Sequence, residues 1–250
     1  MTLLSVVKDV CAAVGVTVPQ SVFSNITGNR TMQEMLSLAN EMAQRIAYDT
    51  RDWTLLIGEA SYLGSQFVVY PPDPAGWVRL PDRFRRLTVD GNIWRQSTPQ
   101  TPMRFIPSAE EWLQRRMGGA VDGRGEWRIG GSWLEVFPVP EPTDVIRFNY
   151  YSKNFVNIHG SEADGESDVF LNDNDKFYLD ERLLKLAMIY QWKAQKGSSY
   201  AEDMSTYGDA LAIAMGHDQP APIMIDRKPI SAYARTAIPT QTIYVPGPVP

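Results

Sequence analysis

The chain opens with hydrophobic residues at helical spacing. Apolar side chains over residues 3–14 fall on one face of a helix, which Thr2 caps and Gly15 ends in a left-handed conformation. The next apolar stripe follows the capping-box letters Thr31-Met-Gln-Glu34 and continues to about Thr50. The N-terminal part of the chain is therefore predicted to form two amphipathic helices.

Helical spacing returns in the last third of the sequence. The apolar positions between about Asp180 and Lys196 cover more than one face of a helix, which is typical of a helix that packs between others. The capping-box letters Ser199-Tyr-Ala-Glu202 predict one more helix, which ends at Gly216. We expect the helix over 180–196 to lie at the centre of a small bundle.

Between these helical parts the pattern changes to that of short β-strands. Strands are predicted where β-branched and aromatic runs are separated by Pro- and Gly-containing turns: residues 67–70, 77–80, 87–89, 92–94, 126–129, 133–137 and 145–150. Residues 127–136 form the clearest hairpin, because two glycines separate its halves. One helix interrupts the strands; it begins at Ser108 and is expected to place Trp112, Leu113 and Met117 inward.

Together these patterns predict an α+β fold, a small helical bundle with an inserted antiparallel β-rich module and an extended C-terminal arm. The predicted parts are a helical body (1–56 and 178–217), a β-rich insertion with one short helix (57–157), an acidic loop (158–177) and a Pro-rich arm (218–250). The arm mixes seven prolines with isolated hydrophobic residues, so it cannot build a core of its own. It is expected to be extended and to become ordered against a partner.

Composition narrows the chemistry that this fold can carry. The chain has 250 residues, of which 44% are hydrophobic, and a net charge of −5, so it is long and apolar enough to bury a core. Its one cysteine and two histidines exclude an internal disulfide framework and multi-cysteine metal sites. No run approaches the roughly 18 apolar residues of a membrane span, and no secretory signal is expected. We expect a soluble protein made in the cytoplasm, with no membrane partner.

Catalytic and metal-binding motifs fail when they are tested residue by residue. The sequence has no phosphate-binding loop and no nucleophile elbow. Asp173 and Asp175 resemble the start of a calcium loop, but Phe177 and Tyr178 stand where the next ligand and the required glycine belong. We therefore expect no enzyme activity and no cofactor, while a looser cation site in the acidic loop stays open.

The charges are unevenly distributed along the chain. Residues 79–128 hold ten arginines, six acids and no lysine, whereas residues 162–181 hold eight acids and one lysine. Arginines among aromatic residues favour planar hydrogen bonding and stacking. A solvated strand surface, a nucleic-acid surface, or a basic face that meets an acidic face on a neighbouring copy each explain this pattern. The negative net charge weakens the nucleic-acid interpretation.

Three groups of residues are candidates for interaction with partners. The candidates for a basic subunit-interface face are Arg83, Arg85 and Arg86. The candidates in the acidic loop are Asp164, Glu166, Asp168, Asp173 and Asp175. The candidates for docking of the arm onto a neighbour or another protein are Pro220, Pro222, Pro229, Tyr233, Pro239, Tyr244 and Pro246.

Several segments resemble one protein family, and they do so in order along residues 3 to about 216. The segments are 3–15, 38–41, 52–53, 78–87, 107–112, 127–138, 148–155, 183–197 and 200–202. They are similar to the head-to-tail adaptor, or tail-accessory, proteins of short-tailed bacteriophages.

This resemblance implies a structural virion protein without catalytic residues. Copies, typically twelve in that family, form a ring beneath the portal that extends the DNA channel and carries the tail nozzle and fibres, and many such adaptors are monomers until the portal organises them. Helices form the ring body, C-terminal segments reach the portal, and genomic DNA passes without specific binding. The alternatives are another virion ring, such as a nozzle or head-completion protein, or an Arg/Trp-based nucleic-acid or carbohydrate-binding module.

Overall fold

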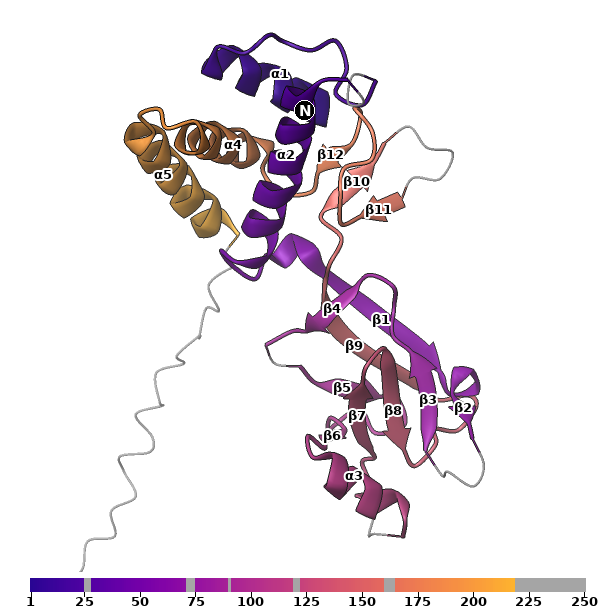
Figure 1. The fold of residues 1–250 in the computed structure, drawn as a ribbon. Helices are drawn as coiled ribbons and strands as arrows, with labels where there is room; N and C mark the ends of the chain where they lie inside the picture. Colours follow the sequence, from indigo (N-terminus) through magenta and orange to yellow (C-terminus); the bar gives the residue numbers. More distant parts are fainter. Residues whose placement is uncertain (25–27, 71–74, 90, 119–121, 160–164, 219–250) are drawn as a thin grey trace, which may run out of the picture. The chain divides into compact units, whose positions relative to one another are not determined.

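The computed structural model describes residues 1–24, 28–70, 75–89, 91–118, 122–159 and 165–218. Its α+β class is the one that the sequence predicts, with residues 1–218 forming one compact unit (Figure 1). The candidate arm residues Pro220, Pro222, Pro229, Tyr233, Pro239, Tyr244 and Pro246 lie outside the described residues, as does Asp164 of the acidic loop. No helix in the described part of the chain is long and apolar enough to cross a membrane.

The two N-terminal helices form where their hydrophobic stripes predict them. In α1 (Leu3–Val14) the Thr2 side chain accepts a hydrogen bond from the Ser5 N–H, and Gly15 ends the helix at φ 73°. In α2 (Arg30–Tyr48) the cap is Asn29, whose side chain accepts from the Thr31 N–H, so the capping box predicted from Thr31 is wrong. Asparagine caps at least as well as threonine, and the helix therefore starts earlier.

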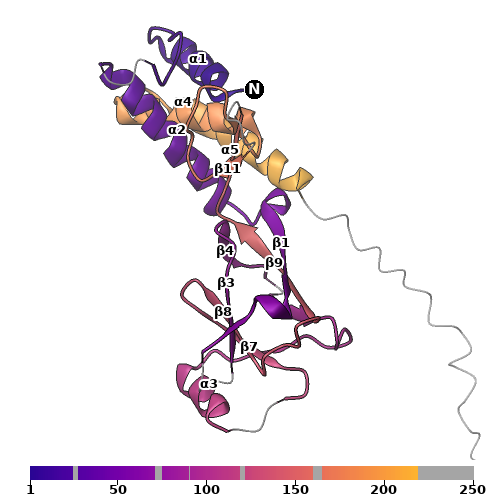
Figure 2. The ribbon, with the colours of Figure 1, turned by 90° about the vertical axis from the view of Figure 1, so that its right-hand side faces the viewer.

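Helix α4 (Glu181–Gln195) is central, as predicted. It contacts α1, α2 and α5 (Ala201–His217), and its first turn is capped by the side chain of Asp180. Figure 2 shows these four helices gathered at one end of the ribbon. The capping box predicted from Ser199 is wrong, because α5 begins after Tyr200 without a side-chain cap and continues through Gly216 to His217.

One hydrophobic core joins these helices. Its largest fully buried members from α1 and α2 are Leu3, Met32, Met35, Met42 and Ile46. Trp53, just after α2, is also buried, and its indole N–H donates to the Ile46 carbonyl at 2.7 Å. The same core takes in Phe155 and Phe177, so the segment after the β module is fixed to the helical body.

The β module consists of two sheets. In the first, β9 (Val145–Ser152) pairs antiparallel with β1 (Ile57–Leu63) on one side and with both β4 (Phe84–Leu87) and β5 (Ile93–Arg95) on the other. The second has the order β2 (Val68–Val69), β3 (Gly76–Arg79), β8 (Trp133–Phe137), β7 (Glu126–Gly130), β6 (Arg104–Phe105), with only the β6–β7 pair parallel. Side chains of both sheets share a core that includes Ile146, Phe148, Leu134 and Val136.

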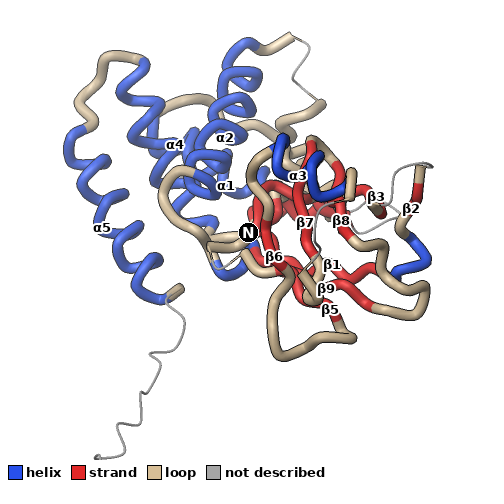
Figure 3. Tube along the Cα trace, turned by 90° about the horizontal axis from the view of Figure 1, so that it is seen from below, coloured by secondary structure: helices blue, strands red, loops and turns tan. Residues whose placement is uncertain are grey.

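Short helical turns and one helix complete the module. The 3₁₀ turns Thr54–Leu56 and Gly64–Gln66 flank β1. Helix α3 (Ala109–Arg116) covers part of the second sheet (Figure 3), where Trp112 packs with Ile106 and Phe137. Trp112 is buried as predicted, but Leu113 is 53% exposed and Met117 80% exposed, so their predicted inward orientation is wrong. Trp112 is the one buried side chain of this short helix, and the ion pair of Arg115 with Glu126 on β7 adds a second contact to the sheet.

The segment predicted as an acidic loop contains regular structure. Its strands β11 (Gly165–Ser167) and β12 (Lys176–Phe177) pair on either side of β10 (Val156–Ile158) in a three-stranded sheet. These strands have two or three residues each, too few to show an alternating hydrophobic pattern. Their partners, rather than their own sequence, determine their conformation.

Candidate interaction surfaces

Of the three arginines predicted to form a basic subunit-interface face, Arg85 and Arg86 lie on β4 and Arg83 lies in the turn just before it, and each has partners in its own chain. The Arg83 Nε donates to the Tyr150 hydroxyl at 2.5 Å, and its Nη1 lies 3.3 Å from a carboxylate oxygen of Glu166. Arg83 and Glu166, one candidate from the basic group and one from the acidic group, therefore form an ion pair within one copy of the chain. A role of these residues at a subunit interface stays a prediction.

Arg85 and Arg86 stack on aromatic rings. The Arg85 guanidinium lies 3.9 Å from the centre of the Tyr48 ring, and the Arg86 guanidinium lies 4.9 Å from that of Tyr151. Arg86 also forms an ion pair with Asp52. Because Tyr48 and Asp52 belong to the helical body, these contacts connect β4 to that body.

Two of the acidic candidates hold the start of α1 in place. Asp175 is fully buried and accepts hydrogen bonds from the N–H groups of Leu171 (2.6 Å), Asn172 (2.8 Å) and His159 (3.3 Å). Its carbonyl oxygen in turn accepts from the Leu3 N–H at 2.8 Å, in the first turn of α1. The carboxylate therefore orders a loop whose backbone caps a helix.

Asp173 has a matching role beside it. Its carboxylate accepts from the Val22 N–H at 2.9 Å and from the Ser21 hydroxyl, and its carbonyl accepts from the Leu4 N–H at 3.1 Å. Glu166 and Asp168 are exposed. Across the described residues, no group of three His, Cys, Asp or Glu side chains is placed to hold a metal ion.

The end of α5 is attached to the start of the β module. The Asp218 carboxylate accepts from the Thr54 N–H at 3.1 Å and from its hydroxyl, and lies 3.7 Å from the Arg51 guanidinium. Arg51 also donates to the Met215 carbonyl. Asp218, predicted as the first residue of the arm, is thus held by the compact unit.

Helix α5 exposes apolar surface on the side away from the core. Along this helix, which is described throughout, Ala210 is the one buried residue. Met204 is 54% exposed and Ile213 58% exposed. Between them runs a stripe of small exposed residues at helical spacing: Ala201, Ser205, Gly208, Ala212 and Gly216.

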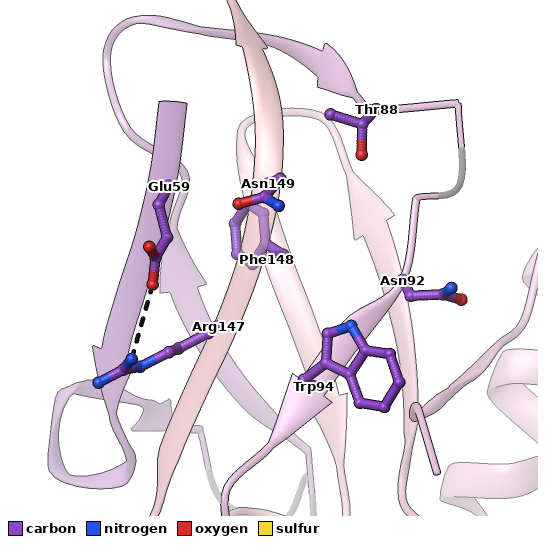
Figure 4. A pocket seen from close by; sticks show the side chains of 7 residues that line it. All are labelled: Glu59, Thr88, Asn92, Trp94, Arg147, Phe148 and Asn149. Carbon is purple, nitrogen blue, oxygen red and sulfur yellow. Dashed lines mark ion pairs between the residues drawn. The ribbon is translucent and has the colours of Figure 1, made fainter. Parts of the chain in front are cut away.

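A polar groove lies on the outer face of the first sheet (Figure 4). One hollow, of about 490 Å³, is lined by Glu59, Thr88, Asn92, Trp94, Arg147, Phe148 and Asn149. A second, of about 290 Å³, is lined by Trp94, Arg95, Gln96, Pro99, Val145 and Arg147. Trp94 and Arg147 line both hollows, so the two hollows lie next to each other across β5 and β9, and we refer to them together as the groove.

The sequence gives no signal for this groove. Trp94 and Arg147 are direct partners in the β5–β9 register although they are far apart in the chain. Trp94 lies in the arginine-rich segment 79–128, but Arg147 and Asn149 lie beyond that segment. Only the pairing of the strands shows which polar side chains share a face with the tryptophan.

The comparisons with known proteins supply no family for the chain. No protein-family model matches it, and no curated protein matches it either.

Proposed function

We propose that this chain is a structural virion protein that forms an adaptor ring between the portal and the tail nozzle of a short-tailed bacteriophage. In this function, copies of the chain surround the DNA channel and carry the nozzle and the fibres. The DNA passes through the channel without sequence-specific binding. The arm beyond Asp218 attaches each copy to the portal or to a neighbouring copy. The ordered resemblance of segments along residues 3 to about 216 supplies the class of protein.

The observation that carries the proposal is the outer face of α5 together with the fixed end of that helix. Met204 and Ile213 leave apolar surface in water on either side of the small-residue stripe. Small side chains allow another backbone to approach closely, and the two larger ones gain free energy when they are covered. A neighbouring copy in a ring is a partner that fits this face.

The attachment of Asp218 to Thr54 and Arg51 supports the same function. The carboxylate of Asp218, hydrogen-bonded to Thr54, fixes the point at which the arm leaves the compact unit. Many copies held in this way would combine weak individual contacts into a stable joint.

Electron microscopy of the purified chain mixed with the portal protein of the same phage tests the proposal. We expect a ring of added density on one end of the portal, with the rotational symmetry of the portal. The chain alone need not form the ring, since assembly on the portal is the property in question. A portal that shows no added density at saturating concentrations of the chain contradicts the proposal, and density at the far tip of a tail favours a nozzle instead.

A pair of matched variants tests the role of α5. Ala212→Glu places a charge in the small-residue stripe and is expected to abolish ring formation without changing the melting temperature of the isolated chain. Gln44→Glu makes the same charge change on an exposed position of α2 and is expected to leave assembly intact. Equal loss of assembly in both variants would show that added charge, rather than this face, is responsible.

A further inference from the structure

The groove around Trp94 has chemistry that the adaptor function does not use. Its centre is Trp94, which is 40% exposed on β5, opposite Arg147 on β9. The Arg147 side chain extends toward Glu59 on β1 and away from the indole (Figure 4), with 3.8 Å between the charged atoms. The ring of Trp94 is therefore left open to solvent beside a row of polar side chains.

The charges in the groove are balanced. Arg147 and Glu59 face each other, and the remaining arginine, Arg95, forms an ion pair with the buried carboxylate of Asp144. A site for nucleic acid needs an excess of cations to replace the counterions of the phosphates. A groove without that excess suits a ligand that carries no net charge.

The uncharged polar groups are available to a ligand. No hydrogen bond joins the side-chain amides of Asn92 and Asn149 to another described residue. Each amide offers two N–H donors and a carbonyl acceptor, and the Thr88 hydroxyl adds a further donor and acceptor. Such groups match neighbouring hydroxyls, which also donate and accept at once. The main chain of β9 is already paired with β1, β4 and β5, so an added peptide strand cannot pair with β9 at the centre of the groove.

We propose that this groove binds a neutral carbohydrate chain. The indole of Trp94 would contact the C–H face of one sugar ring, since its π face carries partial negative charge. Asn149, Asn92 and the Arg147–Glu59 pair hydrogen-bond to hydroxyl groups on one side of the indole, and Gln96 does so on the other. The two hollows, which share Trp94 and Arg147, accommodate consecutive sugars of one chain. This inference does not rest on the adaptor proposal, because it concerns the isolated chain.

The test uses the full chain and a microarray of neutral oligosaccharides built from glucose, galactose, mannose, rhamnose and N-acetylglucosamine. We expect binding to one group of these glycans, followed by a dissociation constant from calorimetry. Trp94→Ala is expected to weaken that binding at least about tenfold, and Asn149→Ala by a smaller factor. Because the ligand is uncharged, raising the salt concentration is expected to leave the dissociation constant within about twofold.

Trp133→Ala is the matched control. Trp133 is 37% exposed, close to the value for Trp94, but it lies on β8 of the other sheet and lines neither hollow. Its loss is expected to leave glycan binding unchanged, and both variants should keep the melting temperature of the parent chain. Absence of binding to every glycan overturns the proposal. So does binding that Trp94→Ala leaves intact, or a Trp94-dependent binding of single-stranded DNA instead of glycans.

Discussion

Asp144, at the start of β9, is a buried carboxylate surrounded by donors. It accepts hydrogen bonds from Arg95, from the N–H (3.1 Å) and hydroxyl (2.8 Å) of Ser97, and from the Val145 N–H (3.0 Å). Burial raises the pKa of Asp144, but the hydrogen bonds from Arg95 and Ser97 outweigh burial and hold the pKa below its ordinary value. The charged form therefore stabilises the fold at neutral pH.

The sign of that pKa shift predicts an acid-dependent loss of stability. The pKa of Asp144 is lower in the folded chain than in the unfolded chain. The contribution of its carboxylate to the free energy of unfolding is therefore present above the unfolded-state pKa and is lost as the pH falls through the folded-state pKa. Asp144→Asn is expected to lower the free energy of unfolding by about 3–5 kcal/mol at neutral pH, since it leaves the Arg95 charge buried without a counterion. It should also flatten the dependence of stability on pH, as measured by urea unfolding over an acidic pH series.

Asp122→Asn is the control for this measurement. The Arg124 side chain and N–H lower the pKa of Asp122 to about 2, but this pair is exposed to solvent. Solvent screens such pairs, so the substitution is expected to change stability little. If Asp144→Asn is as mild as Asp122→Asn, the buried network around Asp144 does not stabilise the module.

The aspartates of the acidic segment give a second prediction at the level of single residues. Asp175→Ala removes a buried carboxylate that accepts from the N–H groups of Leu171 and Asn172, and it is expected to cost about 1–3 kcal/mol of unfolding free energy. Asp168→Ala, at an exposed position in the same segment, is expected to change stability by less than about 0.5 kcal/mol. Chemical denaturation measures both; equal effects would contradict the structural role of Asp175.

At the scale of elements, the sequence predicts those whose signals are local. It does not predict those that form only because they pair with a segment far away in the chain. Helix α1, helix α4 and the β7–β8 hairpin are predicted because caps, apolar stripes and a two-glycine turn lie within each segment. Strand β1 is missed because Ala60 is its one buried residue, so it shows no alternating hydrophobic pattern. Its pairing with β9, about ninety positions away, makes it a strand.

The same distinction applies to the candidate interaction residues. The sequence selects Arg83, Arg85 and Arg86 by their type, and type alone predicts an exposed basic face. Their partners Glu166 and Tyr48 come from segments that only the fold brings close to β4. Long-range contacts of this kind decide whether an arginine is free for another subunit or is used within its own chain.

Helix α5 is attached to α4 through tyrosines, and this predicts sensitivity to alkali. The rings of Tyr207 and Tyr190 lie 5.1 Å apart, and burial, with a smaller effect of Tyr190, raises the pKa of Tyr207 to about 12. The pKa of Tyr207 is higher in the folded chain than in the unfolded chain. The contribution of the neutral Tyr207 hydroxyl to stability is therefore complete below the unfolded-state pKa of about 10 and is lost as the pH rises toward the folded-state pKa.

Phenolate absorbance and far-ultraviolet circular dichroism, recorded together over an alkaline titration, measure this effect. We expect helix content to fall over the same pH range in which the last phenolate absorbance appears, near the pKa of Tyr207 of about 12. Tyr207→Phe is expected to remove that part of the absorbance. Burial also raises the pKa of Tyr62 to about 12, and this residue lies in the β module, so Tyr62→Phe is the matched control. It should remove a late phenolate signal while leaving the loss of helix in place. Helix loss that Tyr207→Phe does not alter would place the sensitive group elsewhere.

At the scale of the whole molecule, we expect the boundary at Asp218 to separate the residues needed for stability from those needed for the proposed assembly. Residues 1–218 form a compact unit, and the Asp218 carboxylate belongs to it through Thr54 and Arg51. Removal of residues 219–250 is therefore expected to leave the melting temperature unchanged while abolishing attachment to the portal. Removal of residues 218–250 takes away the partner of the Thr54 N–H as well and is expected to cost about a further 1–3 kcal/mol.

Thermal unfolding and portal binding of these two truncated chains, with Asp218→Ala in the full chain as the third variant, distinguish the possibilities. Asp218→Ala should lower stability as the longer deletion does, yet still join the portal because the arm is present. If the chain of residues 1–218 joins the portal as well as the full chain, the arm does not make the attachment. If it melts well below the full chain, the arm packs against the core, and a tether that is part of the core is not free to reach a neighbouring subunit.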